Sequence, residues 1–245
     1  MKFEKYSASG NDFIIFHSEK KEDRSKLAIE LCDRHNGIGA DGLIVVVPNS
    51  NYDFEWQFYN SDGSSANMCG NGSRACAHYA FKHNLAKESM KFLTGAGVIN
   101  AKVDGDIVEV ELTTPQEIRA PFEAEGFTWY SYDTGVPHLV AIVTDLENFN
   151  IEISRKLRYG YNANINFMLI DDSLHVRTYE RGVEDETLAC GTGMAACFYA
   201  AYKLVMAKSH SRVIPKSKEE LFFRIENNKI FFKGSVKNTF LATLN

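Results

Sequence analysis

The chain has 245 residues, 44% of them hydrophobic, so it can bury the core of one large domain or of two smaller ones. Its formal net charge is −5, with basic residues scattered among acidic ones, which argues against a nucleic-acid partner and favours small solutes. The sequence begins without an apolar leader, and no segment approaches the ~20 apolar residues of a membrane span, so we expect a cytoplasmic protein with no membrane partner.

Short segments of alternating polar and apolar residues dominate the chain and predict half-buried strands. The alternation is clear at residues 54–58 and at residues 107–112, which follow an Asp-Gly turn. Two further strand-like runs, residues 221–225 and 229–233, flank Asn227-Asn228 and predict a hairpin.

Helical periodicity is confined to four segments, residues 25–35, 72–83, 151–158 and 193–208. Many short strands with so few helices favour the α+β class over a doubly wound sheet. A boundary between two domains is predicted at Thr113-Thr114-Pro115, where an alternating strand stops and an acidic loop begins.

The cysteines are few and odd in number, which predicts reduced thiols rather than a disulfide framework. Their spacing gives little support to a zinc site, and we expect no bound metal. Cys76 and Cys197 lie two helical turns beyond Cys69 and Cys190, a position that suits core packing, and Cys32 lies in an amphipathic helix and is also expected to be structural.

A short segment occurs twice in the chain. Residues 69–80 and 190–201 align without gaps, and Cys, Gly, Gly, Ala, Cys and Ala recur at the same places in both. Each copy follows a strand-like run that contains an aromatic residue. We therefore expect two related halves that face each other across a cleft, with one loop and one helix from each half.

In both copies a cysteine immediately precedes a Gly-x-Gly turn that opens a helix. The start of a helix presents backbone N–H groups and the positive end of the helix dipole, which bind anions and lower a cysteine pKa from its free value of ~8.5. Exchange of the α-proton of an amino acid requires two acid–base groups on opposite faces of the carbon, and Cys69 and Cys190 meet that requirement. The N–H groups that would stabilise the carboxylate and the carbanion are those of Gly70, Asn71, Gly191 and Thr192.

Two other classes of protein use similar features. The pattern Gly-x-Gly-x-x-Ala also occurs in dinucleotide-binding folds, where the helix N-terminus binds pyrophosphate. The sparse βαβ pattern, and the cysteine at the same place in both copies, argue against that interpretation. A non-catalytic amino-acid-binding protein would keep the carboxylate donors but would not need both thiols.

Several motifs occur together in the order typical of one family. They are Ser9-Gly10-Asn11-Asp12-Phe13, Gly37-Ile38-Gly39-Ala40-Asp41-Gly42, Asn60-Ser61-Asp62-Gly63, Met68-Cys69-Gly70-Asn71-Gly72, Gly135-Val136-Pro137-His138, Asn164-Ile165-Asn166-Phe167, Tyr179-Glu180-Arg181-Gly182 and Ala189-Cys190-Gly191-Thr192-Gly193. With these motifs the chain resembles the diaminopimelate epimerases. The resemblance implies two pseudo-symmetric halves, each a curled, mostly antiparallel sheet around a central helix, with the active site in the interdomain cleft. The first half is expected at residues 1–114, which the C-terminal strand 236–245 can complete, and the second at residues 115–235.

The resemblance also implies the reaction, which is the interconversion of LL- and meso-2,6-diaminopimelate in the lysine and peptidoglycan pathway, without pyridoxal phosphate, metal or another cofactor. In it, Cys69 and Cys190 resemble the acid–base pair. The residues that resemble holders of the reacting carboxylate are Asn71, Gly191 and Thr192. Those that resemble a clamp for the other carboxylate are Asn60, Asn164 and Arg181, with Arg181 able to act through a bidentate fork. The remaining residues that resemble lining of the site are Asn11, Glu180 and His138.

Val136 departs from the family pattern, because many relatives have asparagine there, so one hydrogen bond to the substrate is missing or replaced. The nearest alternatives share the fold and are a racemase of another amino acid, such as histidine, or a proline or hydroxyproline epimerase. The last of these typically carries histidine where Asn71 stands, and the cysteine pair excludes isomerases of the fold that lack it. The sequence leaves a homodimer open.

Overall fold

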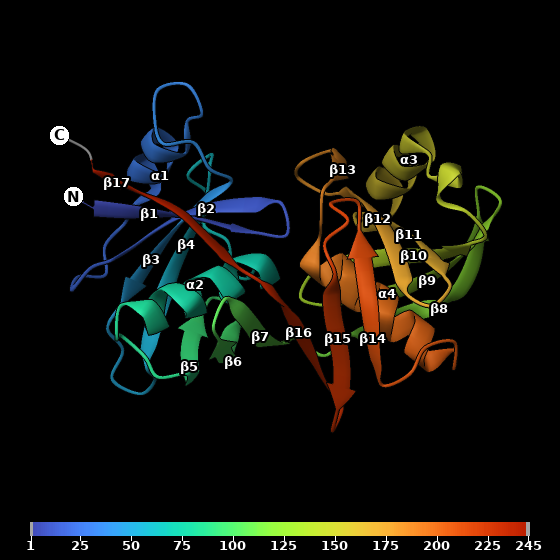
Figure 1. Ribbon diagram of the computed structural model, residues 1–245. Coiled ribbons are helices and arrows are strands. Elements are labelled where there is room, and N and C mark those ends of the chain that lie inside the picture. Colours follow the sequence, from blue (N-terminus) through green and yellow to red (C-terminus); the bar gives the residue numbers. More distant parts are fainter. Residues whose placement is uncertain (1, 244–245) are drawn as a thin grey trace. The chain divides into compact units, whose positions relative to one another are not determined.

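Two helices are buried along almost their whole length, and each has a sheet wrapped around it (Figure 1). The computed structural model describes residues 2–243. Its residue contacts divide the chain into unit 1, residues 1–111 and 233–245, and unit 2, residues 112–232. Helix α2 (Gly70–Lys82) lies in unit 1 and α4 (Gly191–Lys203) in unit 2. Both are rich in glycine and alanine, which lets strands pack against a helix on every side.

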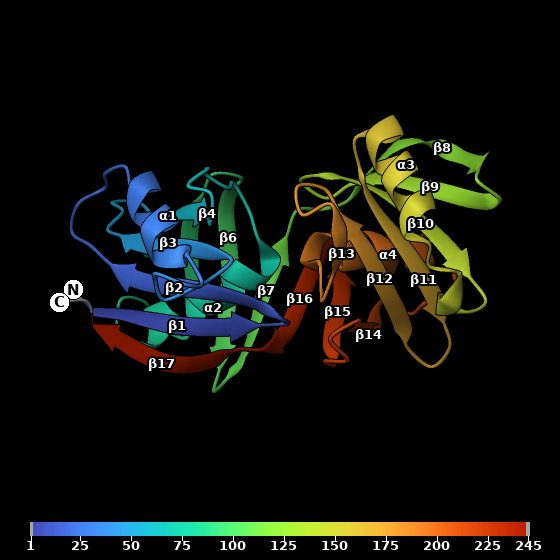
Figure 2. The ribbon, with the colours of Figure 1, turned by 90° about the horizontal axis from the view of Figure 1, so that it is seen from above.

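The sheet of unit 1 is mixed and mostly antiparallel. Strand β1 pairs antiparallel with β2 and with the last strand β17, β2 pairs parallel with β3, and β4 pairs parallel with β5. Strands β17 and β1 lie side by side in Figures 1 and 2. The strands of this unit are β1 (Lys2–Ala8), β2 (Asn11–His17), β3 (Gly42–Val47), β4 (Phe54–Asn60), β5 (Ser89–Thr94), β6 (Gly97–Asp104), β7 (Ile107–Leu112) and β17 (Lys237–Thr243).

Unit 2 has a sheet of the same kind. Strands β9 and β10 form an antiparallel pair, β10 pairs parallel with β11, and β12 pairs parallel with β14. Its strands are β8 (Gln116–Ala124), β9 (Phe127–Asp133), β10 (Pro137–Val143), β11 (Asn164–Ile170), β12 (Leu174–Glu180), β13 (Asp185–Thr187), β14 (His210–Pro215) and β15 (Leu221–Glu226). Strand β16 (Lys229–Ser235) then leads the chain back into unit 1.

A short helix covers the outer face of each sheet. In unit 1, α1 (Ser25–Cys32) packs Ala28 and Leu31 into an apolar cluster with β2 and β3. In unit 2, α3 (Ile151–Tyr161) packs Leu157 into a cluster that contains Trp129 and Phe167. The 3-10 turn η1 (Leu146–Asn148) precedes α3.

The two units repeat one order of pairings. Each unit begins with an antiparallel hairpin, which is followed by a short helix and a parallel strand. An antiparallel strand, the buried helix and a second parallel strand come next. The registers place Phe13, Ile44 and Phe58 of unit 1 at positions equivalent to His138, Asn166 and Thr178 of unit 2. The predicted α+β fold of two pseudo-symmetric halves, each a curled sheet around a central helix, is confirmed.

The predicted helix starts were wrong by two residues at both repeated segments. Helices α2 and α4 begin at Gly70 and Gly191 rather than at residues 72 and 193. The Gly-x-Gly sequence therefore forms the first turn of each helix, because Cys69 and Cys190 themselves occupy the N-cap positions.

The predicted ends of α1, α2 and α4 were too late, that of α2 by one residue, and α3 extends beyond its predicted end to Tyr161. Helix α1 ends at Cys32 because the chain folds back and the N–H groups of Ile38 and Gly39 donate to Leu31 O. Helix α4 ends at Lys203, where Val205 takes a left-handed conformation with φ 59° and Met206 N donates to Ala201 O.

The predicted strands agree with the structure. Asn227 and Asn228 both have positive φ, as a two-residue hairpin turn between β15 and β16 requires. The Phe223 and Phe232 rings stack across this hairpin with centroids 4.7 Å apart.

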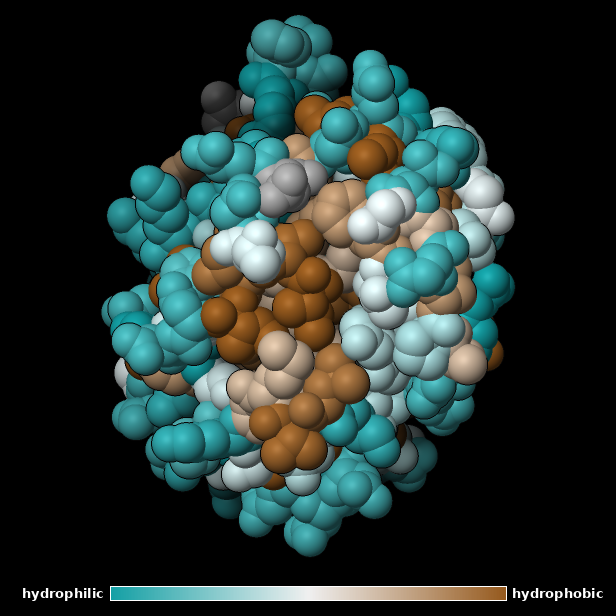
Figure 3. All heavy atoms as spheres, turned by 90° about the vertical axis from the view of Figure 1, so that its right-hand side faces the viewer, coloured by the Kyte–Doolittle hydropathy of each residue, from teal (hydrophilic) through white to brown (hydrophobic). Residues whose placement is uncertain are grey.

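Among the described residues, no helix is long and apolar enough to cross a membrane. Figure 3 views the side of the molecule that lies on the right in Figure 1, and apolar side chains gather there in a patch surrounded by polar ones. Exposed apolar residues of unit 2 include Leu204, Val205 and Met206, which follow α4.

Candidate active site

Cys69 is the N-cap residue of α2. Its backbone is extended, with φ −151° and ψ 117°, and its Sγ accepts a hydrogen bond from Gly72 N at 3.4 Å. The side chain is half-buried. An N–H donor and the start of a helix both favour negative charge on the sulfur. The local sequence thus places a thiol where a thiolate is stabilised.

Cys190 has the same backbone setting at the start of α4, with φ −116° and ψ 110°. It is more deeply buried, at 7% exposure, and its Sγ lies 3.5 Å from Thr192 Oγ1. Either atom of this pair can be the donor. The repeated segment therefore gives both thiols one backbone geometry but different polar partners.

Backbone N–H groups without a helical acceptor follow each cysteine in the chain. The first helical hydrogen bond runs from Ser73 N to Cys69 O in α2 and from Met194 N to Cys190 O in α4. The amides before these bonds have no acceptor within their helix and can bind an anion. They include those of Gly70, Asn71, Gly191 and Thr192, the residues that the sequence indicated.

The Asn71 side chain is held inside unit 1. It is 1% exposed, its Oδ1 accepts from Arg74 Nη2 at 2.9 Å, and its Nδ2 donates to Asn11 Oδ1 at 2.7 Å. Asn11 is half-buried at the start of β2 and donates from Nδ2 to Asp41 Oδ2 at 3.0 Å. The backbone N–H of Asn71, rather than its amide side chain, is therefore the group available to a carboxylate.

Charged residues support the turn that carries Asn11. Asp12 forms an ion pair with Lys5 Nζ at 2.8 Å and accepts two hydrogen bonds from Arg34, at 2.9 and 3.0 Å. Burial alone would raise the pKa of Asp12, but the bonds from Arg34 and Lys5 lower it to about 2. Asp12 also accepts from the backbone N of Asp41, which fixes the loop before β3.

Polar residues lie beneath the start of α4. His138, Asn166 and Thr178 are all buried, and a Cβ at Gly193 would collide with Asn166 Oδ1. Burial, and after it the charge of Arg181, lowers the pKa of His138 to about 3, so the ring is neutral.

The remaining predicted residues lie at strand ends. Asn164 Oδ1 accepts from Arg181 N at 2.7 Å, and Arg181 Nη1 donates to Asn162 O at 3.3 Å. Glu180 is half-buried at the end of β12. Asn60 closes a turn after β4, because its Nδ2 donates to Ser64 Oγ at 2.9 Å. Unit 1 thus brings together Cys69, Asn71 and Asn11, and unit 2 brings together His138, Asn164 and Arg181.

Several residues of these networks, among them Lys5 and Arg34, were not predicted from the sequence. Asn166 lay in a recognised motif without an assigned role, and Thr178 gave no signal. Arg74 could have been found, because it is a charged residue in a segment of small residues and its counterpart in the second copy is Ala195. Within residues 2–243, no group of three or more His, Cys, Asp or Glu side chains is placed to hold a metal ion.

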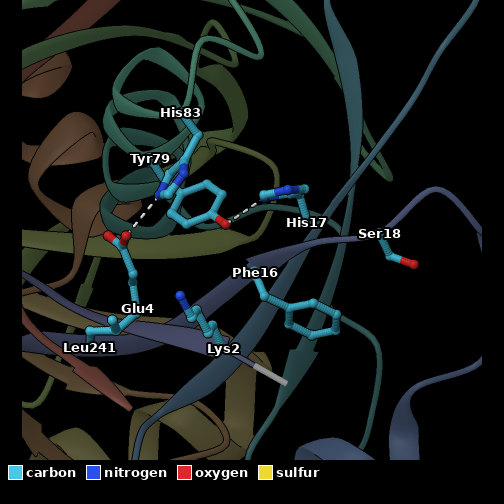
Figure 4. Close-up of a pocket in the computed structure, with 8 residues that line it drawn as sticks. All are labelled: Lys2, Glu4, Phe16, His17, Ser18, Tyr79, His83 and Leu241. Atoms are coloured by element: carbon cyan, nitrogen blue, oxygen red, sulfur yellow. Dashed lines mark hydrogen bonds and ion pairs between the residues drawn. The ribbon is translucent and has the colours of Figure 1, made fainter. Parts of the chain in front are cut away.

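A cavity of about 430 Å³ lies elsewhere in unit 1, between the β1–β2 hairpin, β17 and the end of α2 (Figure 4). In it, Glu4 Oε1 lies 2.7 Å from His83 Nε2, and Tyr79 Oη lies 2.8 Å from His17 Nδ1. Neither Cys69 nor Cys190 lines it. The lining residues are Lys2, Glu4, Phe16, His17, Ser18, Tyr79, His83 and Leu241.

Comparison with solved structures supports the fold. A predicted epimerase from Pseudomonas aeruginosa superposes with a TM-score of 0.77 at 13% identity, covering 99% of this chain and 98% of that one. A phenazine biosynthesis protein of the PhzF family from Enterococcus faecalis has a TM-score of 0.75 at 16% identity, covering 99% of both chains. At such low identity these similarities concern the fold alone.

Sequence comparison identifies the family. The family model for diaminopimelate epimerase matches residues 3–118 and 130–237. A diaminopimelate epimerase from Nitratiruptor sp. is 59% identical over 98% of this chain and 97% of its own. The enzyme of that name from Campylobacter lari is 56% identical over 100% of this chain and 99% of its own. The one from Helicobacter pylori is 44% identical over 100% of this chain and 96% of its own. The chain belongs to the diaminopimelate epimerase family.

Proposed function

We propose that this protein is an isomerase that interconverts LL- and meso-2,6-diaminopimelate, with Cys69 and Cys190 as its two acid–base groups. The observation that carries the proposal is that each cysteine caps the buried helix of its unit, at equivalent places in two units of the same topology. Full-length relatives that bear the name of this activity support the choice of substrate.

In the proposed reaction the two units present their thiols to opposite faces of one α-carbon. One sulfur, as thiolate, takes the α-proton, and the electron pair of the broken C–H bond spreads into the carboxylate. The other sulfur, as thiol, gives its proton to the opposite face, so the two cysteines exchange protonation states in each turnover. Acid–base catalysis by the thiols alone would accelerate the reaction about 10²- to 10⁴-fold. Amides at the helix starts and exclusion of water must supply the rest.

The two cysteines differ in a way that suits these roles at rest. Gly72 N donates to Cys69 Sγ, a contact that favours a thiolate, whereas the Thr192 hydroxyl beside Cys190 Sγ can accept from a thiol or donate to a thiolate. The Gly72 contact thus suits Cys69 to the thiolate role, and Thr192 lets Cys190 take either protonation state.

The far end of the substrate would be held by side chains at the strand ends. Arg181 can offer its guanidinium to the second carboxylate, since Asn162 and Asn164 hold its position. Asn60 and Asn164 contribute amides, and Glu180 and His138 line the site near the reacting amino group. Val136, where many relatives have asparagine, supplies no side-chain hydrogen bond.

The test is deuterium incorporation. The purified protein is incubated with LL-diaminopimelate in D₂O, and both stereoisomers are analysed at low conversion. We expect deuterium in the meso product with little in the recovered substrate, because separate groups remove and supply the proton. Incorporation only into another amino acid would instead indicate a racemase on the same fold.

Variants assign the activity to the two thiols. Cys69→Ala and Cys190→Ala should each abolish exchange, whereas Cys32→Ala, which removes a buried thiol at the end of α1, should retain it. Full activity in either of the first two variants would contradict the roles proposed for these cysteines.

A further inference from the structure

The starts of α2 and α4 pack on different kinds of side chain, apolar in unit 1 and polar in unit 2. In unit 1 a Cβ at Gly72 would lie 3.3 Å from Ile44 Cδ1 and 3.5 Å from Phe13 Cε1, so the helix start packs on apolar atoms. The equivalent positions beneath Gly193 in unit 2 are polar and buried. Buried polar groups are costly unless they are hydrogen-bonded. We therefore expect the buried polar side chains of His138, Asn166 and Thr178 to have a specific role.

The Asn166 amide can have only one orientation. Leu139 O, a carbonyl oxygen that can only accept, lies 2.9 Å from Asn166 Nδ2, so the nitrogen must be on that side. Thr178 Oγ1 donates to Asn166 Oδ1 at 2.9 Å. The second hydrogen of Nδ2 is left for His138 Nδ1, at 3.1 Å.

This orientation decides where His138 carries its proton. Each ring nitrogen faces an amide nitrogen, but Asn166 Nδ2 is closer to Nδ1, at 3.1 Å, than Asn164 Nδ2 is to Nε2, at 3.4 Å. Nδ1 is therefore the acceptor, and the neutral ring carries its hydrogen on Nε2. A proton on Nδ1 would face the Asn166 N–H directly. Burial and the nearby Arg181 guanidinium further disfavour the charged ring, as the low pKa of His138 indicates.

The neighbour on the other side of the ring cannot use that hydrogen. Asn164 Nδ2 lies 3.4 Å from His138 Nε2, but the Asn164 amide is itself fixed, because its Oδ1 accepts from Arg181 N at 2.7 Å. Asn164 Nδ2 donates to Pro137 O at 3.3 Å, and with the ring hydrogen on Nε2 the 3.4 Å contact joins two donors and is not a hydrogen bond. The Nε2–H is left to serve an acceptor that arrives beside Asn164.

We propose that Asn166 is a positioning residue that locks His138 as the neutral Nε2–H tautomer, so that His138 serves the site as a hydrogen-bond donor through Nε2 and does not act as a base. The tautomer follows from the distances within unit 2, whereas the place of His138 in the site rests on the proposed function.

The first test needs no substrate. The protein is labelled with ¹⁵N-histidine, and the ring signals of His138 are assigned by their loss in His138→Gln. We expect a protonated Nε2 and a bare Nδ1, unchanged between about pH 5 and 8, since the hydrogen bond from Asn166 holds Nδ1 as an acceptor. A protonated Nδ1, or titration within this range, would overturn the proposal even if epimerisation is confirmed.

The second test changes the lock. Asn166→Asp replaces the donor with an acceptor of nearly the same shape, so the proton should move to Nδ1 and kcat should fall at least about tenfold. Thr178→Val removes one hydrogen bond to Asn166 but leaves the bond from Asn166 Nδ2 to Leu139 O, so this variant should retain the Nε2–H tautomer. Asn51→Asp is the charge control, because it adds the same charge at an exposed position. An Asn166→Asp protein that keeps both the tautomer and kcat would refute the positioning role, whatever the substrate proves to be. If Asn166→Asp does not fold, the Thr178→Val spectrum still tests the proposal. A shift of the His138 proton to Nδ1 in that variant would show that Leu139 O does not fix the orientation of the Asn166 amide.

Discussion

Arg74 Nη2 donates to Asn71 Oδ1 at 2.9 Å, three residues earlier in the same helix, and so fixes the direction of the Asn71 amide. The guanidinium is fully buried, and it also donates to Ser9 Oγ at 2.6 Å and to Ser235 O at 2.7 Å. One side chain thus ties the start of the cysteine helix to the first hairpin and to the end of β16. The equivalent residue of α4, Ala195, cannot form such a link.

Replacement of Arg74 should therefore destabilise unit 1. Arg74→Met leaves Asn71 Oδ1 and Ser9 Oγ, both of buried residues, and Ser235 O without this donor, at a cost of about 1–3 kcal/mol for each buried group that finds no other partner. We expect a clear fall in the urea midpoint of unfolding, whereas Lys87→Met, at an exposed position, should leave it within experimental error. Equal midpoints for the two variants would mean that the Arg74 bonds contribute nothing net.

The thiols should differ in reactivity towards iodoacetamide at pH 8. Burial raises the pKa of Cys32 to about 12 and raises those of Cys76 and Cys197 well above the ordinary thiol value, so these three remain protonated and enclosed. Cys69, half-buried and bonded to Gly72 N, should be alkylated first, and the more buried Cys190 more slowly. Peptide mapping over time gives the order, and early modification of Cys76 would contradict this account.

Asp12 should make stability depend on pH in the acid range. Its folded pKa of about 2 lies below the ordinary value of 3.8, so its contribution is complete above about pH 4 and is lost as the pH falls through 2. Asp12→Asn should therefore cost about 2 kcal/mol at pH 7, and the difference from the parent should shrink below pH 4. Asp172→Asn, at an exposed position with no such bonds to Arg34 and Lys5, serves as the control in urea unfolding at each pH. A pH-independent difference for Asp12→Asn would rule out the linkage.

The two equivalent glycines should respond differently to one added methyl group. In Gly193→Ala the Cβ would collide with the fixed Asn166 amide, and we expect a loss of about 1–3 kcal/mol together with lower activity. In Gly72→Ala the Cβ meets the flexible end of Ile44 at 3.3 Å, and the better helix propensity of alanine offsets part of the strain. Thermal unfolding of the pair, side by side, gives the comparison. Equal losses would show that the Asn166 amide can move.

The sequence was sufficient to predict the duplicated architecture. Two aligned copies of a cysteine segment, each after a short strand, indicated two related halves, and the Asn227-Asn228 pair indicated the late hairpin. These features are local, because alternation, turn residues and repetition are visible within a few residues of one another. The exact helix limits were not predictable, since Cys69 and Cys190 are unusual N-cap residues and the end of α1 depends on a chain reversal after it.

Only the tertiary structure decided what the polar side chains do. Asn71 is 60 residues from Asn11, and Asn166 is 28 residues from His138, so no local pattern pairs them. Their roles depend on strand register, which sets the face on which a side chain lies, and on fixed acceptors such as Leu139 O, which determine where each hydrogen points. The sequence by itself thus identified the cysteines, and the packed strands determined the direction of the hydrogen bonds around them.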